Sequence, residues 1–359
     1  MKAGIIGAGI MGQLLALNLL NAGWEVTVFD RNDDINCSMA AAGLLTPVSE
    51  LVKNDLIIFE LGIEAISQHW PWIINQLQQP IYFQNQGSLL LAHPRDQAEL
   101  SSFINIIKDK LQNVPDALQQ HIKTIKPSEL EPDLTKINHG YYFATEGCID
   151  NQVFLKTLQQ YLLNQVIWHK NIEVEKIIAG SIIAKNISQS FDMVFDCRGL
   201  AAKNRFENLR GVRGELAWLW APEVNIQRPI RLLHPRYSLY IVPRADATYI
   251  LGASEIEAED HSAISVKTLL ELLTSAYWLH SGFSEARLIK TVTHCRPTLP
   301  DQLPKIKYGK QMIAINGLYR HGFLIAPTLA ADILLFLKSG LSKVNYPNLW
   351  EQAHDTSAV

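Results

Sequence analysis

Apolar residues near the start of the chain occur first as a short run and then with the spacing of a helix. Ala3–Ile6 is the short run, which is typical of a buried strand. The residues that then share one helical face are Leu14, Leu15, Ala16, Leu19 and Leu20. Gly23 is a residue type that commonly ends a helix, and Val26–Phe29 is a second strand-like run. The pattern predicts a strand, a tight turn, a helix and a strand.

Apolar and β-branched residues in the second half of the chain predict a hairpin and two further strands. The hairpin comprises Tyr237–Val242 and Thr248–Gly252, with its turn around residues 245–247. One further strand ends at about Asp196, shortly before Gly199, and the other covers Met312–Ile315. A strand that ends in glycine at the carboxyl edge of an open α/β sheet is a common place for a ligand.

Two helices are predicted after the hairpin. The stretch 265–283 carries apolar residues at a spacing of three to four, which predicts an amphipathic helix with a structural role. Its apolar residues are Val266, Leu269, Leu270, Leu273 and Tyr277. The second helix is expected to begin at Pro327, because proline suits the first turn of a helix. It should run to about Lys338 and stop at Gly340.

Three glycines fill the predicted turn after the first strand in the spacing G-x-G-x-x-G. Glycine permits the sharp turn, the close approach of a pyrophosphate and the packing of helix on strand, and the helix N-terminus offers free N–H groups to phosphates. Asp30 ends the second strand, where its carboxylate can accept hydrogen bonds from ribose hydroxyls. We predict a dinucleotide site; the acid argues against NADP but leaves NAD and FAD open. The loop is formed by Gly7, Ala8, Gly9, Ile10, Met11 and Gly12.

Small side chains crowd together after the second strand, between Ser38 and Gly43. A backbone that carries only small side chains lets a bulky group lie against it, which would suit a flat cofactor. Close packing of one helix on another explains the same residues equally well. On these residues alone both interpretations remain open.

Composition narrows the classes of function. A chain of 359 residues is long enough for about two domains with a large core. Its net charge is -3 and it has no block of like charges. Nucleic acid and anionic membrane surfaces both require clustered Lys and Arg, so neither is predicted as a partner.

Cysteine usage and the N-terminal run indicate a cytoplasmic protein without a metal. Cys37, Cys148, Cys197 and Cys295 are far apart and form no C-x-x-C pair, which favours reduced thiols over disulfides or a zinc site. The glycines in the N-terminal apolar run are explained by a strand, turn and helix and not by a signal peptide. No segment is predicted to span a membrane.

Eight stretches of the chain resemble, in order, those of the D-amino acid oxidase family of flavoproteins, and within it the glycine oxidases of thiamine biosynthesis. They cover nearly the whole chain, which makes the resemblance more specific than any single motif. The stretches are CSMAAAGLLTP (37–47), GSLLLAHPRDQAEL (87–100), ATEGCIDNQVFLKTL (144–158), LRGVRGELAWL (209–219), LYIVPR (239–244), ILGASEIE (250–257), CRPTLPD (295–301) and NGLYRHGFLIAP (316–327).

The resemblance implies an α/β fold whose two domains interleave in sequence. A Rossmann-like FAD-binding domain would take residues 1–80, 144–205 and 296–359. An α+β substrate-binding domain, built on a large mostly antiparallel sheet, would take residues 81–143 and 206–295. Relatives in this family often assemble into homo-oligomers, so the same is possible here.

The resemblance also implies which residues meet the substrate and the FAD. Arg296 and Arg320 would bind the substrate carboxylate, with guanidinium forks that suit a carboxylate better than lysine, and Tyr240 would add a hydrogen bond. His321 is expected to have no required acid–base role. The residues implied at the cofactor are Gly7, Ala8, Gly9, Ile10, Met11, Gly12, Asp30, Arg31, Ser38, Ala41, Ala42, Gly43, Leu44, Gly199, Arg296, Gly317, Tyr319, Arg320, His321 and Gly322.

The activity that the resemblance implies is oxidation of a small amino acid, with glycine favoured. Hydride transfer to flavin N5 would give an imine or 2-oxo acid and ammonia, dioxygen would give hydrogen peroxide, and the product would supply thiamine thiazole synthesis. A D-amino acid or sarcosine oxidase or dehydrogenase of the same fold is the nearest alternative. An NAD-dependent hydroxyacid dehydrogenase and a non-catalytic flavin-binding module are more distant, because neither accounts for the later stretches.

Overall fold

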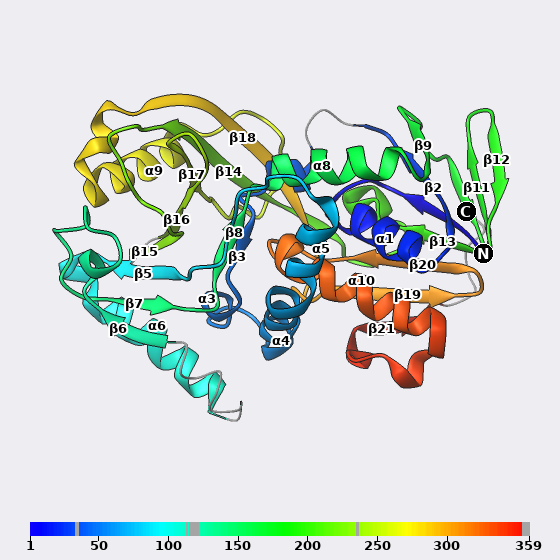
Figure 1. Cartoon of the computed structure of the whole chain (residues 1–359), viewed down its shortest axis with the longest axis horizontal. Coiled ribbons are helices and arrows are strands. Elements are labelled where there is room, and N and C mark those ends of the chain that lie inside the picture. The colour runs from blue at the N-terminus through cyan, green and yellow to red at the C-terminus, as the bar shows by residue number, and fades with distance from the viewer. Residues whose placement is uncertain (33–35, 113, 115–121, 235–236, 354–359) are drawn as a thin grey trace.

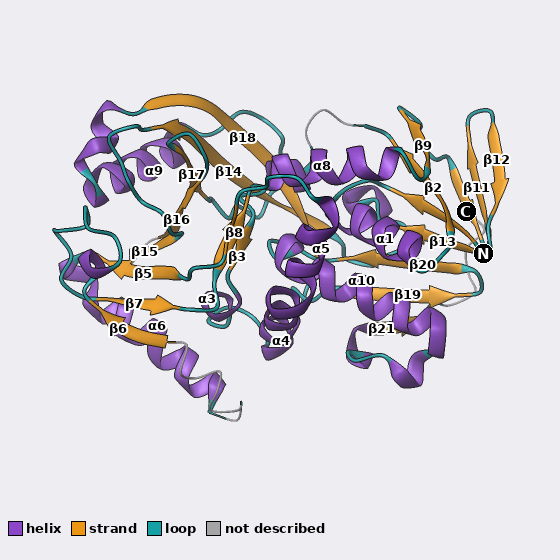
Figure 2. Cartoon of the chain, in the orientation of Figure 1, coloured by secondary structure: helices purple, strands orange, loops and turns teal. Residues whose placement is uncertain are grey.

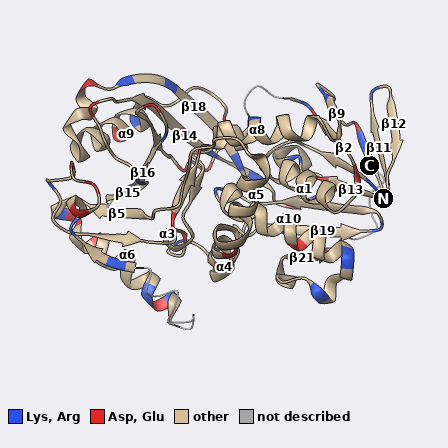
Figure 3. Ribbon diagram, in the orientation of Figure 1, with Lys and Arg blue, Asp and Glu red and all other residues tan. Residues whose placement is uncertain are grey.

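The computed structural model describes residues 1–32, 36–112, 114, 122–234 and 237–353, arranged around two large sheets that lie side by side (Figure 1). Helices flank both sheets (Figure 2). Positively and negatively charged residues are interspersed along the ribbon in both halves of the molecule (Figure 3). The helices are α1 (Ile10–Asn21), α2 (Cys37–Ala40), α3 (Pro47–Glu50), α4 (Leu56–Glu64), α5 (Trp70–Leu77), α6 (Gln97–Leu111), α8 (Asn151–Leu163), α9 (Val266–Leu279) and α10 (Gly322–Ser339).

The seven-stranded sheet has the order β21-β19-β20-β13-β1-β2-β9, and every pair except β19–β20 is parallel. Its central strands are apolar on both faces because both faces are covered. Helix α1, packed against α10 and α8, covers one face, and the segment 176–191 packs on the other. The predicted strand, turn, helix and strand at the start of the chain are confirmed as β1, α1 and β2. The strands are β1 (Lys2–Ile6), β2 (Glu25–Asp30), β9 (Ile167–Lys170), β13 (Met193–Asp196), β19 (Lys305–Gly309), β20 (Met312–Asn316) and β21 (Trp350–Gln352).

The eight-stranded sheet has the order β18-β14-β17-β16-β15-β5-β7-β6, and only the β15–β5 pair is parallel. The predicted hairpin is confirmed as β16 and β17. The strands are β5 (Ser88–Ala92), β6 (Ile122–Ile125), β7 (Gly140–Phe143), β14 (Arg210–Trp220), β15 (Ile230–His234), β16 (Tyr237–Pro243), β17 (Thr248–Gly252) and β18 (Arg287–Thr298).

Two small sheets complete the fold. One is a meander of β10 (Lys176–Ile178), β11 (Ser181–Ala184) and β12 (Ile187–Ser190). The other joins β3 (Leu44–Leu45), β8 (Gly147–Ile149) and β4 (Phe83–Gln84). Because β3 directly follows the small-residue segment, its pairing in this sheet fixes the position of that segment's carboxyl end.

The predicted start of the last long helix is wrong. Helix α10 begins at Gly322, and Pro327 lies inside it. Proline lacks the N–H that would bond to the carbonyl four residues earlier, and the indole Nε1 of Trp70 donates to that carbonyl, on Phe323, at 3.1 Å. A side chain from α5 therefore replaces the missing helical hydrogen bond. The predicted stop at Gly340 is confirmed.

The apolar face predicted for the helix after the hairpin is also not the buried one. In α9 the buried residues are Thr268, Leu272, Ser275, Ala276 and Leu279. Val266, Leu270 and Tyr277 are instead mostly exposed. Two overlapping stripes of apolar residues run along this helix, and contact with the eight-stranded sheet, which the pattern does not reveal, selects between them.

The sequence predicted no segment able to span a membrane. By length and composition only, helix α10 is an exception. It is 18 residues long with a mean hydropathy of 1.6, and is the one helix in the described part of the chain long and apolar enough to cross a bilayer. Its apolar residues pack against α1 and α4 in the core. A helix in a protein core is as apolar as a membrane span, because its side chains are buried among other apolar residues.

Candidate functional site

A cavity of about 1110 Å³ extends from the glycine loop after β1 to the face of the eight-stranded sheet. Its wall includes Gly9 and Asp30 at one end and Gly214 and Tyr240 at the other. Most ligand pockets are between about 300 and 1,000 Å³. This cavity is large enough for a dinucleotide with a small molecule beside it.

The glycine loop has the backbone that a dinucleotide requires. Gly7 has a φ of +92°, and a Cβ there would lie 2.8 Å from the carbonyl oxygen of Cys197. A Cβ on Gly12 would lie 1.9 Å from the carbonyl oxygen of Gly7, so only glycine lets α1 approach the loop. Asp30 accepts a hydrogen bond from the Ala8 amide at 3.1 Å, which holds its carboxylate at the loop.

The small-residue segment lines the cavity, and this bears on the two interpretations left open by its sequence. Its Ser38–Ala40 portion belongs to the four-residue helix α2, in which the Asn36 side chain caps the Met39 amide. The Ser38 hydroxyl accepts from the Ile10 amide at 3.0 Å, joining the segment to the start of α1. Gly43 has a φ of +61°, and a Cβ there would lie 2.0 Å from the carbonyl oxygen of Ile149. Close packing and cavity lining therefore both operate in this segment.

Arg296 extends from β18 into the cavity as a cation without an acidic partner among the described residues. Its Nη1 donates to the carbonyl oxygen of Ser254 at 3.1 Å. Gly214, on the neighbouring strand β14, makes room for the guanidinium, because a Cβ there would lie 2.1 Å from Nη2. The site thus presents one guanidinium whose charge is available to an anion.

Arg320 is already paired, which sequence reasoning did not anticipate. Its Nη2 lies 2.8 Å from Glu50 Oε2, and Arg231 Nη2 donates to Glu50 Oε1 at 2.7 Å. Burial acts to raise the pKa of Glu50, but the positive charges of Arg320 and Arg231 outweigh burial and hold that pKa far below its ordinary value. Glu50 is therefore a permanent anion between two arginines.

Glu255 is a second carboxylate beside Arg320. It lies 2.8 Å from Lys53 Nζ and 3.5 Å from Arg320 Nη1, and it accepts a hydrogen bond from the Tyr319 hydroxyl. Burial opposes ionisation of Glu255, but the Arg320 charge and the Lys53 and Tyr319 hydrogen bonds lower its pKa to about 2. Glu255 is consequently charged at neutral pH.

His321 and Tyr240 are neutral groups on the same wall. Burial lowers the pKa of His321 to about 4, and Glu50 counteracts this only in part. His321 Nε2 lies 3.2 Å from Asn54 Oδ1, which can only accept, so this contact requires the proton on Nε2. Tyr240, from β16, lines the cavity, and burial raises its pKa. Neither side chain is a ready proton acceptor at neutral pH.

Most residues expected at the cofactor or substrate line the cavity. Among the described residues, Gly12 and Gly317 do not: Gly12 packs on Gly7, and a Cβ on Gly317 would meet Leu299. The expected residues on the wall are Gly7, Ala8, Gly9, Ile10, Met11, Asp30, Arg31, Ser38, Ala41, Ala42, Gly43, Leu44, Gly199, Tyr240, Arg296, Tyr319, Arg320, His321 and Gly322.

Several charged residues of the wall were missed from sequence, among them Arg231, Glu50 and Glu255. Arg231 had a usable signal, because an arginine inside the apolar run IRLLH needs a partner when it is buried. Glu50 and Glu255 gave no such signal, since both were expected outside a helix or strand, where a carboxylate is usually solvated. Their partners lie far away in the sequence.

Glu146 is a buried carboxyl immediately behind this wall, and it yields a prediction about stability. It accepts from the Ser49 amide at 2.6 Å and the Ser88 hydroxyl at 2.5 Å, while burial raises its pKa to about 7. A carboxyl whose pKa is raised on folding stabilises the protein below its unfolded pKa, and this stabilisation is lost as pH rises through the folded pKa. From pH 5 to pH 8 the loss from Glu146 should be roughly 2–3 kcal/mol.

Glu146→Gln should remove this component of the pH dependence, because the amide does not titrate. Urea unfolding at pH 5 and pH 8 in saturating FAD measures the difference. The matched control is Glu129→Gln, on an exposed turn, which should retain the wild-type pH dependence. An unchanged pH dependence in Glu146→Gln would contradict the assignment.

Comparisons with known proteins agree with this geometry. The profile of a family described as FAD dependent oxidoreductase matches residues 2–334. The chain is 32% identical over 336 residues to a protein of Rhizobium etli described as a thiamine biosynthesis oxidoreductase, ThiO, covering 93% of this chain and 95% of that protein.

Two solved structures show the same fold. Iminodiacetate oxidase of Chelativorans sp. BNC1 superimposes with a TM-score of 0.83 and 18% identity, covering 98% of this chain and 99% of that chain. Glycine oxidase of Geobacillus kaustophilus superimposes with a TM-score of 0.82 and 17% identity, covering 99% of each chain. The predicted fold class is confirmed by these likenesses.

Proposed function

The chain belongs to the family of FAD-dependent oxidoreductases and its cofactor is FAD, and on this premise we propose that it oxidises a small amino acid, with glycine favoured. The products would be the imine or 2-oxo acid, ammonia and hydrogen peroxide. The observation that carries the proposal is Arg296, a cation without an acidic partner among the described residues, in the cavity that begins at the glycine loop. A guanidinium fork matches the geometry of a carboxylate, which it can bind through two parallel hydrogen bonds.

The residues present fit FAD. The backbone amides at the start of α1 can donate hydrogen bonds to a pyrophosphate. The tight turn at Gly7, where a Cβ would clash, lets the pyrophosphate approach the backbone. Asp30 would accept from the adenosine ribose, and the segment from Ala40 to Leu44 offers a wall of small side chains to the flavin. When bound, FAD supplies the chemistry, which is acceptance of a hydride at N5.

The protein's own residues would hold the substrate. Arg296 would bind the carboxylate in a bidentate manner, and the Tyr240 hydroxyl would donate to one of its oxygens. Arg320 would contribute through its Nε, which is buried without a hydrogen-bond partner in the described part of the chain. The substrate amine must be neutral to release hydride. Burial lowers the pKa of His321 to about 4, so His321 is neutral as well and we assign it no required acid–base role.

The thiamine relationship supports the physiological role. The relative from Rhizobium etli is described as a thiamine biosynthesis oxidoreductase, so the product would supply synthesis of the thiazole of thiamine. D-Alanine and sarcosine remain alternative substrates of the same site. Membership of an FAD family leaves the NAD-dependent alternative without support. Assembly into a homo-oligomer remains part of the proposal.

The test is reduction of the bound flavin. The FAD-loaded protein is mixed without oxygen with glycine, sarcosine or D-alanine, and loss of the flavin absorbance is followed. We expect the fastest bleaching with glycine, and peroxide on admission of oxygen. Bleaching without peroxide would indicate a dehydrogenase that uses another acceptor. Absence of bleaching with all three amines would contradict the proposed function.

A further inference from the structure

The charges on the substrate wall suit one carboxylate and not two. The inner charge cluster comprises Glu50, Arg231, Glu255, Arg296 and Arg320. Within it, Glu50 bridges Arg231 and Arg320, and Glu255 contacts Arg320 from the other side. The two carboxylates therefore compensate two of the three guanidinium groups. One positive charge is left over, at Arg296.

Glu255 directly follows, in the sequence, the residue whose carbonyl the proposed carboxylate anchor contacts. Arg296 Nη1 donates to the carbonyl oxygen of Ser254, the residue before Glu255. The Tyr319 hydroxyl donates to Glu255, and the charge of Arg296 acts to lower the pKa of Tyr319. A ligand held by Arg296 would thus meet the negative charge of Glu255 if it extended along this wall.

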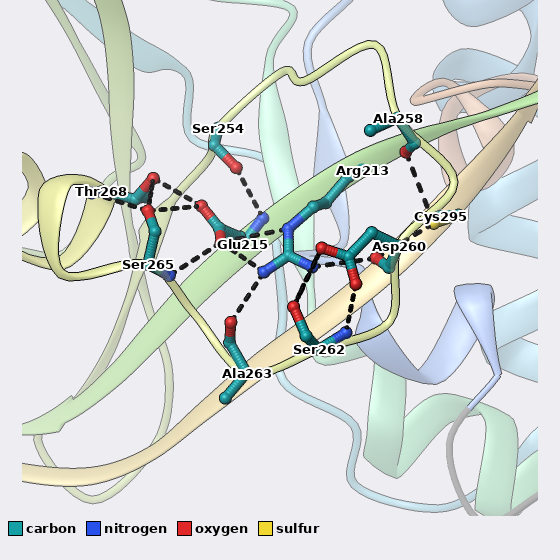
Figure 4. Close-up of polar contacts among 10 residues, drawn as sticks. All are labelled: Arg213, Glu215, Ser254, Ala258, Asp260, Ser262, Ala263, Ser265, Thr268 and Cys295. Atoms are coloured by element: carbon teal, nitrogen blue, oxygen red, sulfur yellow. Dashed lines mark hydrogen bonds and ion pairs between the residues drawn. The ribbon is translucent and has the colours of Figure 1, made fainter.

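The backbone that carries Glu255 is held rigidly. On one side, the Glu215 amide donates to Ser254 Oγ at 3.0 Å, and on the other, Arg213 and Ile256 exchange backbone hydrogen bonds at 2.9 and 3.0 Å. Figure 4 shows Arg213 and Glu215 of β14 in hydrogen bonds with the loop that follows Ser254. Arg213 and Glu215 are themselves buried and paired at 2.7 Å. These bonds fix the backbone on either side of Glu255, and its carboxylate is held by the contacts to Arg320, Lys53 and Tyr319.

Lys53 compensates Glu255 only in part as far as a ligand held at Arg296 is concerned. Its ammonium lies 2.8 Å from Glu255 at the rim, and its side chain is 56% exposed. Water screens a charge in that position. The inner charge cluster is less exposed than Lys53, with Glu255 at 34% and Arg320 at 19%, and its own groups keep a single surplus positive charge.

From these contacts we infer that Glu255 restricts the substrate to amines with one carboxylate, and that it excludes iminodiacetate-like dicarboxylates. The inference rests on the proposed function, because it assumes that the substrate carboxylate binds at Arg296. A single carboxylate neutralises the surplus charge. A second carboxylate would leave a net negative charge in the cavity and would face Glu255, which is costly in a site of low dielectric.

The experiment compares two ligands that cannot be oxidised as amines. Glycolate carries one carboxylate, and oxydiacetate carries two in the arrangement of iminodiacetate. Their dissociation constants are measured from the perturbation of the flavin spectrum of the FAD-loaded protein. We expect the wild type to bind glycolate at least about tenfold more tightly than oxydiacetate, a difference of about 1.4 kcal/mol.

Three variants locate the effect. Glu255→Gln keeps the shape and should lower the preference for glycolate by about tenfold. Lys53→Gln removes a positive charge at the rim and should increase the preference. Glu257→Gln is the matched control, because Glu257 lies two residues on, pairs with Arg210 outside the cavity and is exposed. It should leave the preference unchanged.

The outcomes separate this inference from the proposed function. An unchanged preference in Glu255→Gln, an equal change in Glu257→Gln, or a wild type that binds neither ligand or both alike would overturn the inference. Glycine reduction is measured on the same samples. If glycine reduces the flavin but Glu255→Gln leaves the glycolate preference unchanged, the proposed function is retained and the inference about Glu255 is rejected. The expected preferences without any amine oxidation would refute the proposed function and retain the charge selection.

Discussion

Replacing Arg296 with alanine should lower kcat/KM for glycine by about 100-fold or more. A bidentate guanidinium–carboxylate contact comprises two charge-assisted hydrogen bonds, each contributing about 1.5–3 kcal/mol, and 1.4 kcal/mol corresponds to a factor of ten. Arg296 is also the one member of the inner charge cluster without an acidic partner in the described structure. Without Arg296 the other four members of the inner charge cluster carry no net charge, so the carboxylate would lose the surplus positive charge that attracts it.

The measurement is flavin reduction by glycine in a stopped-flow instrument, which separates the binding constant from the rate of reduction. We expect most of the effect in binding. Arg296→Lys should be intermediate, because lysine keeps the charge and lacks the fork. The control is Arg210→Ala, which removes an exposed ion pair with Glu257 and should change the rate little. Full activity of Arg296→Ala would eliminate the proposed anchor.

The dinucleotide half of the site could be predicted from sequence because it is local. Gly7, Gly9, Gly12 and Asp30 belong to one strand, turn, helix and strand, and each follows from a backbone requirement that sequence spacing records. The hairpin β16–β17 was predictable for the same reason. Strand order and the interleaving of the two sheets were not, since no periodicity encodes which distant strands pair.

The charge arrangement at the substrate end could not be predicted from sequence. Arg320 was expected to wait for a substrate anion, but Glu50 and Glu255 already lie against it. These partners come from α3 and from the loop after β17, and only the packed fold brings them together. The arginine that carries the surplus charge is identified by counting partners in space. The sequence indicated which arginines lie at the site, but it did not show which of them pair with carboxylates.

Replacing Glu50 with glutamine should destabilise the FAD-loaded protein by about 3–5 kcal/mol. Glu50 is the shared anion of Arg231 and Arg320, whose side chains are only 15% and 19% exposed. Removing one member of a buried ion cluster leaves the others desolvated and unpaired, which costs more than the cluster contributes as a whole. Urea unfolding at fixed saturating FAD measures the change, since FAD itself shifts the apparent stability.

Two companion variants test this cause. Glu285→Gln removes an exposed carboxylate paired with Arg287 at 3.9 Å and should change the free energy of unfolding by less than about 0.5 kcal/mol. Arg320 keeps Glu255 in Glu50→Gln, whereas Arg231 loses its acidic partner. Adding Arg231→Met to Glu50→Gln removes that unpaired cation and should recover part of the loss. If the double variant is less stable than Glu50→Gln, unpaired charge is not the cause.

The pH dependence distinguishes Glu50 from its neighbour Glu146. The pKa of Glu50 is lowered on folding, so its contribution is present above its ordinary pKa and is lost only in strong acid, as pH falls through the folded value. The deficit of Glu50→Gln should therefore be the same at pH 5 and pH 8. Glu146 has a raised pKa, so the difference between wild type and Glu146→Gln should change over that interval. A Glu50→Gln deficit that disappears at pH 5 would mean that the carboxyl is protonated there, and that the two arginines do not hold it as an anion.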